Sequence, residues 1–202
     1  MYKNRLSADL IDYLWKQIKI AESNSKDLSS GLAGNITRSL TMEDPDAKII
    51  RAMINTIQSC EDAQDRMNEN LLTITNTLPR LFTNKKLVPL LDALWVNFQK
   101  KYEFNPPHLH KGTLSFVIWM KIPYDIKDEE ELPWVKSSNA PRAGHFSFLS
   151  SNCLERSIPL SKEYEGVFCI FPSSLKHMVY PFYTTNHLRV SISGNISFQL
   201  GN

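Results

Sequence analysis

Apolar residues near the start of the chain recur at steps of three and four positions, which is the spacing of a helix with one buried face. Ser7 can cap the start of this helix, and Asp9 suits its first turn. A second run of the same kind spans residues 45–72. Residues 87–98 are ambiguous and fit a helix that ends near Leu94, followed by a strand. The positions that carry the first pattern are Leu6, Leu10, Ile11, Leu14 and Ile18.

The pattern changes from about Tyr102, where short β-rich runs alternate with prolines and polar turn residues. We expect strands at residues 113–122, 144–149, 167–171, 178–182 and 188–200, and a long loop at residues 125–141. This spacing favours an antiparallel sandwich or barrel over alternating βα units. The chain is therefore expected to form a single domain, residues 1–202, in which a helical part, residues 1–86, packs on a β core, residues 87–202.

Composition narrows the classes of function. The 202 residues are 42% hydrophobic and 22% charged, and the formal net charge of +2 is far from the basic excess of nucleic-acid-binding proteins. No apolar stretch approaches the roughly 20 residues that span a bilayer, and the amino terminus does not resemble a secretory signal. Three separated cysteines favour neither a zinc site nor a disulfide framework, so a reduced, cytoplasmic location is expected.

Candidate metal ligands come from the histidines. His108 and His110 lie two positions apart, just before a predicted strand. In an extended chain residues i and i+2 point to the same side, so both imidazoles can reach one metal ion. His177 precedes a later predicted strand and offers a third nitrogen. Imidazole is a common ligand of iron, zinc, copper and nickel. Taken alone, the spacing of the first two histidines is a weak signal and favours strand-edge residues without a metal; the downstream pattern changes that weighting.

A charged residue in the last predicted strand points to an anionic ligand. Arg189, Ser191 and Ser193 alternate with apolar residues, so one face of this strand is polar and the other apolar. A charge inside an apolar β run is costly unless it is paired. The guanidinium of Arg189 matches a carboxylate with two parallel hydrogen bonds, which favours a planar acidic ligand over a surface role.

Several segments together carry a family resemblance. In them the sequence resembles the 2-oxoglutarate- and Fe(II)-dependent dioxygenases of the prolyl-hydroxylase-like branch, and more narrowly the small oxygenases found in cyanophages and marine viral sequences. The resemblance implies an α+β fold with a mainly β core: a double-stranded β-helix (jelly roll, cupin-like) with supporting amino-terminal helices. The segments are residues 32–36, 103–112, 114–123, 166–172, 175–182 and 189–196.

The resemblance also implies Fe(II), 2-oxoglutarate as co-substrate and O2, in an oxygenase similar to the prolyl 4-hydroxylases. His177 matches the second histidine of the family's metal site, and Arg189 matches the basic residue that holds the far carboxylate of 2-oxoglutarate. Ser191 is expected to assist Arg189, and Asn97 to contribute to the same pocket. Further candidates to line the cavity are Trp95, Tyr102 and Trp119.

The acidic position of the family's triad departs from the pattern, because no Asp or Glu stands there. With His108 as the first ligand, the acidic position holds His110, and the site has three histidines. With His110 as the first ligand, it holds Gly112, and a coordination position is open, as in the related halogenases. Both alternatives stay open. We favour three histidines, with His108, His110 and His177 as the catalytic metal ligands, because Leu109 and Lys111 then point away together.

Two other classes of function also stay open. One is a cupin-like metal-binding protein without 2-oxoglutarate chemistry, in which Arg189 is structural. The other is a catalytically degenerate jelly-roll protein of a phage with a structural or interaction role. For the oxygenase, the substrate is a small molecule or a protein side chain, with no membrane or nucleic-acid partner, and a homo-oligomer stays open. If the protein is viral, the expected location is the cytoplasm of the infected cell.

Overall fold

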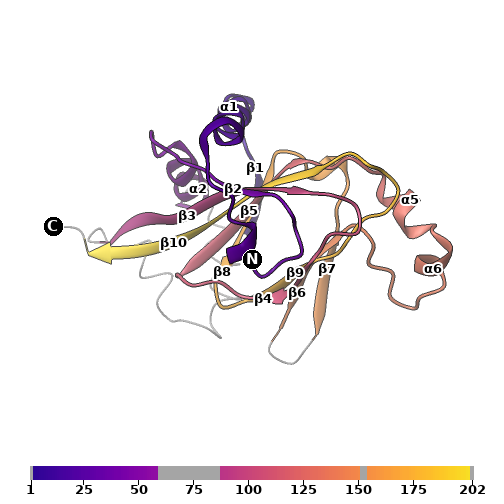
Figure 1. Ribbon diagram of the computed structural model, residues 1–202. Coiled ribbons are helices and arrows are strands. Elements are labelled where there is room, and N and C mark those ends of the chain that lie inside the picture. Colours follow the sequence, from indigo (N-terminus) through magenta and orange to yellow (C-terminus); the bar gives the residue numbers. More distant parts are fainter. Residues whose placement is uncertain (1, 59–86, 151–153, 201–202) are drawn as a thin grey trace.

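Two antiparallel sheets form the core of the computed structural model, which describes residues 2–58, 87–150 and 154–200 (Figure 1). The six-stranded sheet has the order β1 (Tyr2–Arg5), β8 (Val167–Pro172), β5 (Leu114–Lys121), β10 (Arg189–Leu200), β3 (Leu87–Gln99) and β2 (Ser39–Thr41). The four-stranded sheet has the order β4 (Asn105–His108), β9 (Lys176–Val179), β6 (His145–Leu149) and β7 (Glu155–Pro159). From β3 onwards the chain changes sheet six times, after β3, β4, β5, β7, β8 and β9, and only β6 and β7 are consecutive strands of one sheet. This is the jelly-roll path of a double-stranded β-helix.

Two helices cover the six-stranded sheet, and two short ones lie in a connection between strands. The helices α1 (Ala8–Asn24) and α2 (Lys48–Gln58) pack on the outer face of the six-stranded sheet (Figure 1). Two short helices, α5 (Ile126–Glu130) and α6 (Pro133–Lys136), lie between β5 and β6. Single 3-10 turns occur at Ser29–Gly31 and Lys162–Tyr164. Among the described residues, no helix is both long and apolar enough to cross a membrane.

Each face of the six-stranded sheet buries a hydrophobic cluster of its own, because successive side chains of a strand point to opposite sides. Strand β5 shows this directly: Ile118 packs beneath the helices with Leu14 and Met53, whereas Val117 and Trp119 face the other sheet. The second cluster, between the sheets, is rich in aromatic side chains, among them Phe146 and Phe148 of β6 and Phe171 of β8. Burial on both faces explains why the sequence of β5 is an almost continuous apolar run.

Several local predictions are confirmed. Helix α1 begins at Ala8, and the Ser7 hydroxyl accepts a hydrogen bond from the backbone N–H of Leu10 at 3.4 Å, as the capping argument requires. Strands lie in the predicted runs at β5, β6, β8 and β10. The second predicted helix is present as α2, and residues 59–72 of that prediction lie outside the described residues.

Other local predictions are wrong. In the ambiguous segment 87–98, the strand expected at its end is confirmed and the helix considered before it is wrong. Leu94, Val96 and Phe98 face the helices while the residues between them face the cavity, which is a period of two. The predicted loop at residues 125–141 contains α5 and α6, and the Asp125 carboxylate caps the first of them. The strand predicted at residues 178–182 is Lys176–Val179, since it pairs with β6 from Lys176 and Pro181 has no N–H to continue the ladder.

A buried carboxylate ties the α5 connection to the segment that leads into β10. Glu129 is 0% exposed, and its oxygens accept hydrogen bonds from the backbone N–H groups of Tyr183 and Thr184, both at 2.8 Å, and from the Thr184 hydroxyl at 2.6 Å. These bonds satisfy backbone donors of a segment that belongs to no strand. Glu129 therefore fixes the entry of the chain into β10.

Replacing Glu129 by Ala is expected to lower the free energy of unfolding by about 2–4 kcal/mol, because two backbone N–H groups lose their acceptors. Chemical denaturation measures the effect. The control is Glu131→Ala, since Glu131 has a side chain that is 67% exposed and forms an ion pair with Lys136 at the surface. That change should stay within about 0.5 kcal/mol. Equal effects of the two substitutions would contradict the role of Glu129.

Candidate metal centre and cofactor pocket

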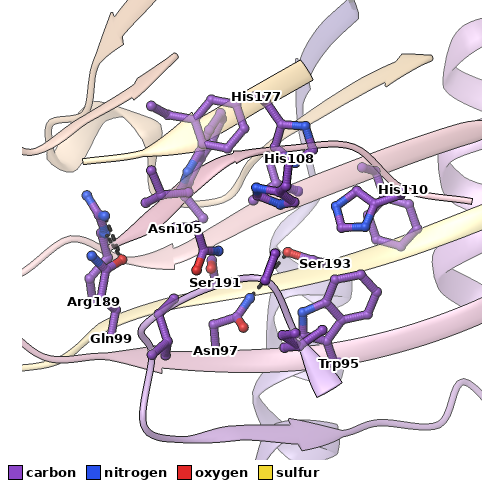
Figure 2. A pocket seen from close by; sticks show the side chains of 18 of the residues that line it. Trp95, Asn97, Gln99, Asn105, His108, His110, His177, Arg189, Ser191 and Ser193 are labelled. Carbon is purple, nitrogen blue, oxygen red and sulfur yellow. Dashed lines mark hydrogen bonds between the residues drawn. The ribbon is translucent and has the colours of Figure 1, made fainter. Parts of the chain in front are cut away.

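A cavity of about 220 Å³ lies between the two sheets (Figure 2). Side chains of β3 and β10 form one wall, and those of β4 and β9 form the wall opposite. The segment from Gly31 to Ile36 contributes part of the lining from outside the sheets. It is anchored beside β4, because the backbone N–H of Asn35 donates to the carbonyl of Phe104 at 2.8 Å.

Three histidines meet at one side of this cavity. His108 and His177 are directly opposite one another on β4 and β9, and His110 follows two positions after His108. One ring nitrogen of each residue lies within 4.8 Å of the corresponding nitrogens of the other two. The ring centroids of His108 and His177 are 4.2 Å apart, and each is 5.0 Å from that of His110 (Figure 2). The three side chains that the sequence singled out are thus brought together.

Hydrogen bonds to the backbone fix the tautomers of two of these rings. Nδ1 of His108 lies 2.7 Å from the carbonyl oxygen of Pro106, and Nδ1 of His177 lies 3.1 Å from that of Leu175. A carbonyl oxygen only accepts, so each Nδ1 carries the proton and donates it. The lone pair is then on Nε2, which is the arrangement in which histidine binds metals with an oriented ring.

Burial keeps the three imidazoles neutral. It lowers the pKa of His108, and it lowers the pKa of His110 to about 4 and of His177 to about 3. The proximity of His108 is a second cause for the other two, because a charge on one ring opposes a charge on the next. Neutral rings need lose no proton when a metal binds, so protons compete little with the metal near pH 7.

This donor set fits a divalent transition metal. Imidazole nitrogen suits iron, zinc, copper and nickel, whereas Mg²⁺ and Ca²⁺ require oxygen ligands. In the described part of the chain, no Asp or Glu lines the cavity. The three nitrogens therefore carry no charge to balance that of a metal ion, and the balancing charge has to come from another ligand.

Arg189 lies in the cavity wall formed by β10 and is only 3% exposed. Its guanidinium donates to Gln99 Oε1, to the Tyr124 hydroxyl, and to the carbonyl oxygens of Gly144 and Tyr180. All these acceptors are neutral, and no ion pair joins Arg189 to a carboxylate among the described residues. A buried charge without a counter-charge is costly. The wall therefore fits an acidic ligand such as a keto dicarboxylate.

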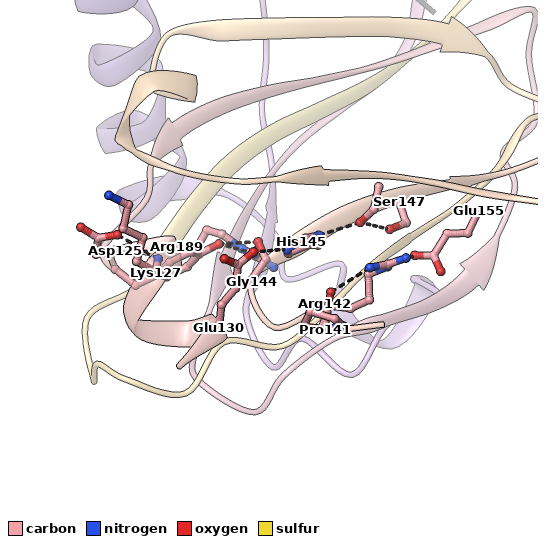
Figure 3. A network of polar contacts seen from close by, with 12 residues as sticks. Asp125, Lys127, Glu130, Pro141, Arg142, Gly144, His145, Ser147, Glu155 and Arg189 are labelled. Atoms are coloured by element: carbon pink, nitrogen blue, oxygen red, sulfur yellow. Dashed lines mark hydrogen bonds and ion pairs between the residues drawn. The ribbon is translucent and has the colours of Figure 1, made fainter. Parts of the chain in front are cut away.

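A polar network supports Arg189 from behind (Figure 3). Gly144, whose carbonyl binds Arg189, is followed by His145, which lies 2.7 Å through Nδ1 from the Ser157 hydroxyl and 3.4 Å through Nε2 from Glu130. Nearby, Arg142 pairs with Glu155 at 3.1 Å. His145 is thus a buried hydrogen-bonded residue outside the cavity, and His187 is exposed on the surface.

The other residues expected in the pocket divide into two groups. Ser191 and Asn97 line the cavity as neighbours on β10 and β3, and Asn97 accepts a hydrogen bond from Ser39 at 2.8 Å. Trp95 and Trp119 line it as well. The expectation for Tyr102 is wrong: its side chain is 61% exposed and outside the lining, because the turn after β3 holds this residue at a φ of 70° and directs it outward.

Sequence reasoning missed Gln99, Tyr124 and Asn105. Gln99 belongs to the same polar face of β3 as Asn97, so the alternation of polar and apolar residues could have revealed it. Tyr124 reaches Arg189 from behind the wall, which nothing in the sequence signals. Asn105 lines the cavity, and its Oδ1 is buried without a hydrogen-bond partner. A buried orphan acceptor at the cavity wall indicates a place where a ligand donor fits.

Comparisons with known proteins indicate a family for this chain. Residues 93–195, about half of the chain, match the family model described as "Putative 2OG-Fe(II) oxygenase". Among curated proteins, no sequence matches the chain.

Solved structures share its architecture. A prolyl-4-hydroxylase from Pseudomonas putida has a TM-score of 0.53 at 13% identity, over 100% of this chain and 92% of that chain. The viral collagen prolyl hydroxylase of Paramecium Bursaria Chlorella virus-1, solved with 2OG, has a TM-score of 0.51 at 11% identity, over 96% and 94%. An oxidoreductase of the 2OG-Fe(II) oxygenase family from Burkholderia pseudomallei has a TM-score of 0.50 at 11% identity, over 96% and 84%. These likenesses confirm the predicted fold class.

The lowered pKa of His177 predicts how acid affects the metal-free protein. The unfolded chain takes up a proton near pH 6.5, whereas the folded protein excludes it down to about pH 3, so acidification favours unfolding. Between pH 7.5 and 5, His177 should account for about 2 kcal/mol of lost stability. His177→Asn should remove that share in urea denaturation at the two pH values, and the surface control His187→Asn should not. An unchanged pH dependence in the first variant would contradict the argument.

Proposed function

Because this chain belongs to the family of 2OG-Fe(II) oxygenases, whose chemistry uses Fe(II), 2-oxoglutarate and dioxygen, we propose that it hydroxylates its substrate at an iron held by His108, His110 and His177. The observation that carries the proposal is the convergence of these three neutral imidazoles in the cavity that Arg189 also lines. When bound, iron and 2-oxoglutarate supply the oxidising chemistry, in which dioxygen is reduced while the keto acid loses carbon dioxide to give succinate.

The chain's own residues have three roles: they orient the metal ligands, bind the co-substrate and exclude water. The backbone carbonyls of Pro106 and Leu175 orient two of the histidine rings toward the metal position. Arg189, at the other side of the cavity, would hold the distal carboxylate of 2-oxoglutarate, with Ser191 and Asn97 beside it. The aromatic cluster between the sheets keeps the remaining wall dry, which strengthens the polar contacts inside it.

The lining supports an uncharged target group. Apart from Arg189, the cavity wall contains neutral side chains, so nothing there would stabilise a substrate cation. Its volume of about 220 Å³ lies below the range of roughly 300–1,000 Å³ that is common for sites of drug-sized ligands. With 2-oxoglutarate in place, only a small part of a substrate fits, such as one side chain of a peptide. Since two proteins of this fold are prolyl hydroxylases, a prolyl peptide is the first substrate to test.

Membership of the oxygenase family favours this function over a cupin-like protein without 2-oxoglutarate and over a degenerate structural protein. In a cupin-like protein Arg189 would be purely structural, yet it is a buried cation in the cavity wall with only neutral partners. A degenerate structural protein would leave the convergence of the three histidines unexplained.

Anaerobic titration tests the proposal. Wild-type protein should bind Fe(II), and 2-oxoglutarate should then produce a visible charge-transfer absorption. His177→Ala removes one of three ligands and should weaken Fe(II) binding by roughly 100-fold or more. The matched control is His187→Ala, which changes an exposed histidine of the same chain and should bind Fe(II) like the wild type. Equal binding by both variants, or no absorption with wild type, would refute the proposed site. Succinate formation in the presence of prolyl peptides measures turnover.

A second variant tests whether His110 stands at the acidic position. His110→Asp should restore the usual two-histidine, one-carboxylate set, and His110→Asn is the uncharged control of the same size. In the absence of 2-oxoglutarate, we expect the Asp variant to bind Fe(II) roughly tenfold more tightly than the Asn variant, because only the carboxylate balances metal charge. If the Asp variant binds iron no better than the Asn variant, His110 does not occupy that position.

A further inference from the structure

The cavity-facing edge of the Arg189 guanidinium already has an acceptor. Gln99 Oε1 lies 3.0 Å from Nε and 2.6 Å from Nη2 of Arg189, so a single amide oxygen bridges the pair of parallel N–H groups that would receive a carboxylate (Figure 2). The two residues are directly opposite one another on β3 and β10, so the register of the sheet enforces the contact.

The remaining donors of Arg189 point away from the cavity. Nη1 binds the Tyr124 hydroxyl at 2.7 Å and the Gly144 carbonyl at 3.2 Å, and Nη2 binds the Tyr180 carbonyl at 2.9 Å. None of these three acceptors belongs to the lining, whereas Gln99 does. All five N–H groups are therefore used, and Gln99 is the partner that a ligand in the cavity would meet first.

The orientation of the Gln99 amide is fixed by its surroundings. Its Nε2 donates to the backbone carbonyl of Glu103 at 2.5 Å, and this carbonyl can only accept. The oxygen must then face Arg189. Gln99 is 3% exposed, so water does not compete for either contact.

We propose that Gln99 is a specificity-determining residue of the co-substrate pocket, whose side-chain oxygen stands in for a carboxylate on Arg189 and is displaced when the distal carboxylate of 2-oxoglutarate binds. This inference rests on the proposed function. A neutral amide holds the guanidinium in place without cancelling its charge, so an anion replaces it favourably. Gln99 thus excludes neutral molecules from Arg189 and admits an acid.

Two substitutions of nearly equal size separate this role from a structural one. Gln99→Glu places a permanent carboxylate on Arg189, which should raise the melting temperature of the ligand-free protein and weaken 2-oxoglutarate binding by about tenfold or more. Gln99→Leu removes the competing acceptor, which should lower the melting temperature and tighten binding by about threefold to tenfold. Calorimetric titration of 2-oxoglutarate into anaerobic Fe(II)-loaded protein gives the affinities, and thermal unfolding of the ligand-free protein gives the stabilities. The controls are Gln199→Glu and Gln199→Leu, which make the same changes at an exposed position of β10.

We expect the variants at position 99 to rank in opposite orders for 2-oxoglutarate affinity and for melting temperature. Affinity should fall from Leu to Gln to Glu at position 99, while melting temperature rises in that order. A merely structural Gln99 would lower affinity and stability together in both variants, and that result would overturn the inference while leaving the function intact. If neither the wild type nor any variant binds 2-oxoglutarate, the proposed function and the inference both fail.

Discussion

The register between β3 and β10 is the constraint on which the site depends. It sets Arg189 against Gln99, Ser191 against Asn97, and Ser193 against Trp95. The opposite faces of the same strands carry apolar residues that pack beneath α1 and α2. Because side chains alternate with a period of two, a slip of one residue would turn the guanidinium into the hydrophobic cluster and the apolar side chains into the cavity. Helix packing and pocket chemistry are thus two results of one register.

Charge links the two sides of the cavity. The histidine cluster offers three neutral donors, and Arg189 has only neutral partners. A divalent metal at the histidines would therefore add to the positive potential that Arg189 already creates. In the described part of the lining there is no acidic side chain to offset it. A dianionic co-substrate would offset most of the combined positive charge of the metal and Arg189, so we infer that metal and keto acid each favour the binding of the other.

The sequence was most informative where a local period was clear. The alternation in β10 isolated Arg189 and Ser191, and the i, i+2 spacing placed His108 and His110 on one side of an extended segment. It was least informative where a long-range contact decides the structure. Gln99 and Arg189 are 90 residues apart, and their contact follows from sheet register that no local pattern encodes. The amino-terminal half of β3 stayed ambiguous between helix and strand because its apolar residues follow one another too closely to show a period.

Strand β4 carries the metal-ligand candidate His108 but forms few pairs with its neighbouring strand. Pro106 and Pro107 lack the N–H group, and the strand pairs with β9 only at Asn105 opposite Val179 and at His108 opposite His177. It also lies at the edge of its sheet, where the same prolines offer no N–H groups for pairing with a strand of another molecule. A metal shared by His108 and His177 would act as a cross-link between these two strands. Metal binding would then stabilise this edge of the sheet, so that the ion has a structural role as well as a chemical one.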